Sequence, residues 1–268
     1  MKLLLLLPLL VLLFWLWVRW LERWVLFQPS RRWQLHLELA GPDAEEITFS
    51  SEDGVALSGV WIPHLKARGV ILFCHGNAGN LSSRIPQAVS WRQLGYSVLL
   101  FDYRGYGRSA GTPSESGVLS DARSAWQEAE RRGMETPILF GRSLGAFAAI
   151  RLAGERQARG LVIDSAFISA RAMAKLVLPV PGLSWFMSLK LDNLEAIPRV
   201  RCPLLVMHGE LDEVVPFQHG RELFNAAPEP KSFLPLPGLG HNDSREQPAV
   251  ERALDHFLEA LPRSPAHE

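Results

Sequence analysis

Short apolar runs alternate with longer amphipathic runs along most of this chain. Apolar, β-branched runs without alternation are typical of strands buried on both faces of a sheet, and the amphipathic runs between them predict helices. The predicted strands cover residues 47–50, 55–62, 69–74, 97–101, 137–140, 161–163, 203–207 and 232–236. The main predicted helices cover residues 83–94, 118–132, 144–155 and 248–261. This order predicts an α/β fold with a mostly parallel central sheet flanked by helices.

The alternation breaks at about residues 166–200. Pro179, Pro181, Gly182 and Pro198 lie here among apolar and aromatic residues, so the stretch cannot form one long helix. We expect a small apolar cap over the sheet.

The amino terminus departs most from globular composition, because residues 3–18 are apolar and interrupted only by Pro8. Apolar residues continue past Arg19 and Arg23, so residues 1–27 are predicted to be a single-pass membrane anchor. A cleaved signal peptide is the alternative, but no small Ala, Gly or Ser suitable for a cleavage site occurs before Ser30. The basic residues after the apolar run favour a cytoplasmic catalytic domain.

The rest of the chain divides into a linker at 28–45, one α/β domain at 46–262 and a tail at 263–268. The 28 basic and 28 acidic side chains balance, which argues against a nucleic-acid partner. Cys74 and Cys202 both lie in apolar runs and are expected to be small buried hydrophobes. No cofactor is expected, and no His or Cys pair has the spacing of a metal site. The sequence does not indicate an oligomeric state.

Candidate chemistry begins with a G-x-S-x-G motif, Gly141 to Gly145, between a predicted strand and a predicted helix. In this context the two glycines relieve crowding at a sharp turn, which presents the Ser143 hydroxyl near a helix amino terminus. Ser143 is therefore the predicted nucleophile.

A serine hydroxyl needs a base and a carboxylate that orients the base. His241 is the predicted base because it lies in a Gly-rich turn between the last strand and the last helix. Asp212 follows the strand at 203–207 and is the predicted acid. Asp164, at the end of the preceding strand, is the competing acid.

The tetrahedral intermediate needs two N–H donors. One is predicted from the backbone of Leu144, directly after the nucleophile. The other is predicted from Asn77, with Ala78 as the alternative, in the glycine-containing HGNAGN run that follows the strand at 69–74.

These motifs resemble the α/β-hydrolase family, and in particular its membrane-anchored ABHD-like and serine aminopeptidase-like branch. The resemblance rests on HGNAGN, FDYRGYGRSAGTPSE, GRSLGA, HGELDEVVPF and GHND. It implies the same Ser-His-Asp triad, and ester, thioester or amide substrates. It also suggests that Arg142 supports the site rather than taking part in the chemistry.

Together these patterns predict a serine hydrolase that cleaves carboxylic esters or thioesters of acyl or lipid-like substrates near a membrane. Trp185 and Phe186 of the apolar cap are the predicted substrate-binding residues. A serine aminopeptidase or amidase is the first alternative, with Asp192 and Glu195 as candidates to grip a substrate amine. A non-catalytic binding protein of the same fold is the second.

Overall fold

The computed structural model describes residues 2–33, 37–133, 136–177, 179–180, 182–244 and 247–262. The side chains of residues 2–7, 184 and 185 lie outside that description, as does the predicted tail at 263–268.

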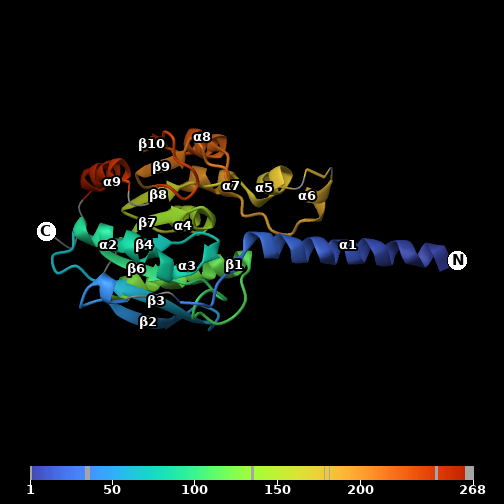
Figure 1. Cartoon of the computed structure of the whole chain (residues 1–268), viewed down its shortest axis with the longest axis horizontal. Coiled ribbons are helices and arrows are strands. Elements are labelled where there is room, and N and C mark those ends of the chain that lie inside the picture. Colours follow the sequence, from blue (N-terminus) through green and yellow to red (C-terminus); the bar gives the residue numbers. More distant parts are fainter. Residues whose placement is uncertain are drawn as a thin grey trace.

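An eight-stranded sheet, in the order β10-β9-β8-β7-β4-β6-β3-β2, forms the centre of the molecule (Figure 1). Its strands are β2 (Glu45–Ser50), β3 (Ala56–Ile62), β4 (Val70–Cys74), β6 (Ser97–Phe101), β7 (Ile138–Arg142), β8 (Gly160–Asp164), β9 (Leu204–Gly209) and β10 (Lys231–Leu236). Only the pairs β2–β3 and β3–β6 are antiparallel in this sheet. The predicted mostly parallel sheet is therefore confirmed.

Helices cover both faces of the sheet, as the apolar strands require. Along β4, Val70, Leu72 and Cys74 belong to one hydrophobic core, and Ile71 and Phe73 belong to the other. Because successive side chains of a strand point to opposite faces, one apolar strand fills both cores. The first core includes residues of α3 (Glu115–Arg131), α4 (Leu144–Glu155) and α8 (Phe217–Ala226). The second includes residues of α2 (Ile85–Gln93) and α9 (Pro248–Ala260).

Short elements complete the fold. The segment predicted to be a cap, called the cap below, contains α5 (Ala170–Val177), α6 (Leu183–Phe186) and α7 (Asn193–Ala196), followed by the 3-10 helix η3 (Ile197–Arg199). Two further 3-10 helices are η1 (Leu37–Ala40) and η2 (Leu81–Arg84). The two-residue strands β1 (Gln28–Pro29) and β5 (Ala78–Gly79) pair in parallel.

The amino-terminal segment forms one helix, α1 (Lys2–Leu26), which projects from the body beside the cap (Figure 1). Among the described residues, no helix is long and apolar enough to cross a membrane, so the structure does not support the predicted spanning anchor. Three charged residues, Arg19, Glu22 and Arg23, lie in the last third of α1.

Candidate active site

The turn at Ser143 is built by two glycines that no other residue could replace. An ideal Cβ at Gly145 would lie 2.0 Å from the Cys74 carbonyl oxygen, and one at Gly141 would lie 2.7 Å from the Cα of Ala146. Both distances are far below van der Waals contact, so helix α4 can approach β4 and β7 this closely only with glycine. Ser143 itself has φ 49° and ψ −114°, a strained conformation for a non-glycine residue. Strain of this kind presents the hydroxyl at the carboxyl end of β7 and the start of α4.

Asp212 and His241 are brought together by two loops at the carboxyl ends of β9 and β10. His241 Nδ1 lies 2.8 Å from Asp212 Oδ2. Since the carboxylate only accepts, Nδ1 carries the proton and Nε2 is left free to act as a base. Both Ser143 and His241 line one cavity of about 580 Å³. No hydrogen bond joins their side chains within the described part of the chain, although such contacts often tighten only with substrate bound.

The side chain of Asp212 is buried, and both of its oxygens accept hydrogen bonds. The backbone N–H groups of Val214 and Val215 donate to Oδ1 at 2.9 and 2.7 Å. On Oδ2, His208 Nε2 approaches to 3.3 Å beside His241. Burial raises the pKa of Asp212, but the hydrogen bonds from His208 and His241 outweigh it and hold the pKa well below its ordinary value. The carboxylate is therefore ionised at neutral pH.

His208 is a residue that the sequence analysis missed. Its Nε2 lies 2.9 Å from the Val215 carbonyl oxygen, so the proton sits on Nε2 and points toward Asp212 as well. The signal was present in the HGELDEVVPF run, where His208 stands four residues before Asp212.

Asp164, the competing acid, is engaged elsewhere. Its Oδ2 accepts hydrogen bonds from Arg142 Nη1 at 3.1 Å and from Ser244 Oγ at 2.8 Å. Arg142 is buried and also donates through Nη2 to the carbonyl oxygen of His241. The pair of Arg142 and Asp164 thus holds the loop that carries His241.

The predicted oxyanion donors flank Ser143. Leu144 is the first residue of α4, and Asn77 lines the same cavity. His75 Nδ1 lies 2.7 Å from the Gly76 carbonyl oxygen, which can only accept. This contact fixes the plane of the Gly76–Asn77 peptide, whose other polar group is the Asn77 N–H. The next peptide is held as well, because the Asn77 carbonyl accepts from Tyr106 Oη at 2.9 Å and from Gln28 N at 3.1 Å.

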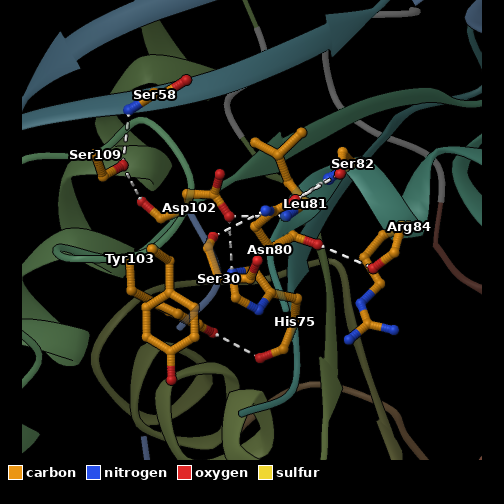
Figure 2. A network of polar contacts seen from close by, with 12 residues as sticks. Ser30, Ser58, His75, Asn80, Leu81, Ser82, Arg84, Asp102, Tyr103 and Ser109 are labelled. Atoms are coloured by element: carbon orange, nitrogen blue, oxygen red, sulfur yellow. Dashed lines mark hydrogen bonds and ion pairs between the residues drawn. The ribbon is translucent and has the colours of Figure 1, made fainter. Parts of the chain in front are cut away.

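A buried polar network supports His75 from behind (Figure 2). Tyr103 Oη donates to the His75 carbonyl oxygen at 3.3 Å, and Asp102 Oδ1 lies 3.3 Å from His75 Nε2 without a hydrogen bond between these two atoms. Asp102 Oδ1 accepts from the Leu81 N–H at 2.7 Å. The sequence analysis singled out neither His75 nor Asp102.

The cavity is lined mostly by apolar side chains. Phe167, Ala170, Met173, Ala174, Val177, Leu183 and Met187 contribute from the cap side. Phe186 instead packs on Phe14 of α1, with ring centroids 5.2 Å apart, and lines a neighbouring groove of about 500 Å³. The Trp185 side chain lies outside the described residues. In the part of the chain that is described, no cluster of three or more His, Cys, Asp or Glu side chains could hold a metal ion.

Comparison with known proteins shows which family the chain belongs to. Residues 65–196 match the family model described as serine aminopeptidase, S33. The uncharacterized protein YfhR of Escherichia coli (strain K12) is 34% identical over 244 residues, which cover 84% of this chain and 85% of YfhR. An uncharacterized protein of Mycobacterium tuberculosis is 38% identical over 207 residues, covering 75% of this chain and 74% of that protein. The chain belongs to the α/β-hydrolase family.

Two further similar proteins have names that state an activity. The lysophosphatidylserine lipase ABHD12 of Macaca fascicularis is 34% identical over 223 residues, which span 72% of this α/β-hydrolase but only 56% of the lipase. The structure of the Pyrococcus furiosus esterase Pf2001 superposes with a TM-score of 0.74 at 21% identity, covering 88% of this chain and 98% of that one. At that identity the esterase supports the fold alone.

The carboxylates considered for binding a substrate amine do not line the cavity of this α/β-hydrolase. Asp192 caps α7 by accepting from the Glu195 N–H at 2.9 Å, and Glu195 pairs with Arg199 at 3.2 Å. Of the described residues that line the cavity, the carboxylates are Glu22 and Glu213. Both already accept backbone N–H groups, Glu22 from the cap and Glu213 from His241.

Proposed function

We propose that this protein is a serine hydrolase that cleaves carboxylic esters, including thioesters, of acyl or lipid-like substrates through an acyl-enzyme. The observation that carries the proposal is the hydrogen bond between Asp212 and His241, whose imidazole lines the same cavity as Ser143. An ionised, fully hydrogen-bonded carboxylate sets the imidazole tautomer that a base needs.

In the proposed mechanism, Ser143 Oγ attacks the ester carbonyl carbon while His241 Nε2 takes its proton. The oxyanion is held by the N–H groups of Leu144 and Asn77, and the positive end of α4 adds to the stabilisation. His241 then returns the proton to the leaving alcohol or thiol. Water, activated by the same imidazole, hydrolyses the acyl-enzyme and frees Ser143.

Labelling with a fluorophosphonate tests the nucleophile. The reagent should attach to Ser143, and Ser143→Ala should abolish both labelling and the hydrolysis of p-nitrophenyl esters. Ser90→Ala on α2, outside the cavity, is the matched control and should keep both. Labelling that persists in Ser143→Ala at another serine would refute the assignment.

We also propose that α1 brings the enzyme to a lipid surface. Its described part exposes large apolar side chains, including Leu10, Trp17, Trp20 and Trp24, and two arginines lie among them. Exposed apolar and aromatic residues with nearby basic ones favour binding at a membrane interface. The full chain should float with liposomes, and Trp20→Glu with Trp24→Glu should weaken that association without changing ester hydrolysis in solution.

A further inference from the structure

Helix α1 has two different faces along its carboxyl-terminal half. Val18 and Glu22 are buried at 2% and 5% exposure, and Leu21 and Val25 are half-buried. These positions recur every three or four residues and so share one side of the helix. Trp17, Trp20 and Trp24 lie on the exposed side.

The buried side of α1 lines the active-site cavity. Val18, Leu21, Glu22, Val25 and Leu26 line the same space as Ser143 and His241. Helix α5 contributes Ala170, Met173, Ala174 and Val177 to that space. Thus α1 and α5 supply apolar walls of the cavity that holds the nucleophile.

The hydrogen-bonded carboxylate of Glu22 holds α1 against the cap segment. Glu22 accepts from the backbone N–H of Ser188 at 2.9 Å, from the N–H of Leu189 at 3.2 Å and from the Ser188 hydroxyl. A carboxylate this buried is costly unless such donors satisfy it. Glu115 of α3 holds the next residues of the same segment, through the N–H groups of Lys190 and Leu191 at 2.8 and 3.1 Å. The cap segment is therefore tied to α1 and to the main domain at once.

We propose that the carboxyl-terminal half of α1 is an acyl-binding wall, with Val18, Leu21 and Val25 as specificity-determining residues and Glu22 as a positioning residue. The inference rests on the proposed ester hydrolysis and names its substrate class, esters with one extended acyl chain. Val18 and Val25 are about 10 Å apart along the helix axis, so a chain lying beside them passes several apolar side chains. Each methylene buried there adds to transition-state binding.

The first test compares the same substitution on the two faces of α1 in the full-length protein. Leu21→Trp fills the cavity, whereas Leu16→Trp adds the same group at a position that is 48% exposed. The ratio of kcat/KM for a decanoyl ester to that for an acetyl ester should fall about tenfold in Leu21→Trp, the loss of roughly two buried methylenes. Leu16→Trp should keep the wild-type ratio. An unchanged ratio in Leu21→Trp, or an equal fall in both variants, would overturn the inference.

Glu22→Gln tests the positioning role. Gln keeps the size of the side chain but loses the charge and one of the two acceptor oxygens. The variant should raise KM for the decanoyl ester several-fold more than it lowers kcat, because the wall shifts while the reacting groups stay in place. An equal effect on acetyl and decanoyl esters would argue for a purely structural role.

A readout that needs no catalysis separates this inference from the proposed function. A diazirine-bearing fatty acid should crosslink to Val18, Leu21 or Val25 in the Ser143→Ala protein, and decanoic acid should compete. Leu21→Trp should reduce the crosslinking. Crosslinks confined to Trp17, Trp20 and Trp24 would reject the acyl-binding wall even if the wild-type protein hydrolyses esters. Crosslinks to the wall, together with a wild-type protein that neither hydrolyses esters nor reacts with the fluorophosphonate, would reject only the proposed reaction.

Discussion

Arg142 Nη1 lies 3.1 Å from Asp164 Oδ2 in an ion pair whose two side chains are buried. Arg142 is the residue directly before the candidate nucleophile, and its other terminal nitrogen donates to the carbonyl oxygen of His241. One guanidinium thus joins the turn at Ser143, the end of β8 and the loop of His241. Asp164 therefore holds Arg142 in place, and Asp212 is the carboxylate that contacts the candidate base His241.

The two carboxylates should therefore respond differently to the same substitution. Asp212→Asn should lower kcat/KM by a factor on the order of 10⁴, because the amide favours the wrong tautomer of His241. Asp164→Asn should instead lower the free energy of unfolding by about 3 kcal/mol, since it leaves Arg142 buried without its counter-charge. Ester kinetics and urea unfolding on both variants measure this. A larger kinetic loss in Asp164→Asn would move the acid to Asp164.

His75 should affect the transition state rather than substrate binding. His75→Gln disturbs the hydrogen bond to the Gly76 carbonyl and so the direction of the Asn77 N–H. Loss of one oxyanion donor typically costs about 10²-fold in kcat, and we expect a fall approaching that with little change in KM. Trifluoromethyl ketone inhibitors should weaken in parallel. His256→Gln, on the exposed surface of α9, is the matched control and should change neither quantity.

Gly145 should tolerate no side chain. In Gly145→Ala the new Cβ would meet backbone atoms of Cys74 and His75, which cannot rotate away. We expect loss of folded protein, or a drop in the free energy of unfolding above about 3 kcal/mol. Gly133→Ala is the comparison, because a Cβ there meets nothing within 4 Å and only its φ of +81° is unfavourable, which costs about 1 kcal/mol. Similar stability of the two variants would contradict the close approach of α4 to β4.

The ionisation of Asp212 gives a pH dependence of stability with a definite sign. Its pKa is lowered in the folded state, so its contribution to stability is fully present above the unfolded pKa of about 3.9 and is lost as pH falls below it. The difference in free energy of unfolding between wild type and Asp212→Asn should be constant between about pH 5 and 7 and shrink below pH 4. A difference that grows on acidification would show that the carboxylate is not stabilised in its ionised form.

Most of the sheet could be predicted because most of its strands are short apolar runs that can be recognised in the sequence alone. The inner strands β4, β6, β7, β8 and β9 are buried throughout and are therefore mostly apolar. The partly exposed edge strands β2 and β10 also coincide with predicted runs to within a few residues. The two-residue strands β1 and β5 were missed, because two residues carry no periodicity. The cap was predicted from the prolines that interrupt residues 166–200, but the sequence could not say which apolar residues of this segment line the cavity.

Candidate site residues could be predicted where a reactive residue type directly follows a predicted strand. Residues that reach the site through contacts between distant segments could not. Asp212 and His241 each follow a strand, and the structure brings their side chains within 2.8 Å. By contrast, the sequence treats residues 1–27 as a separate anchor, while the structure sets Val18 and Glu22 against the cavity and the cap. Contacts between segments so distant in the chain leave no local pattern.

The bond between Glu22 and Ser188 joins residues 166 positions apart in the chain. Long loops cost more entropy to close, and contacts of this span form slowly compared with local ones. During synthesis, Glu22 leaves the ribosome 166 residues before Ser188, so this hydrogen bond cannot form until the cap segment has been made. A chain that ends before residue 188 can contain Ser143 and its strand-to-helix turn. It lacks the hydrogen bond from Ser188 to Glu22 that holds α1 against the active-site cavity.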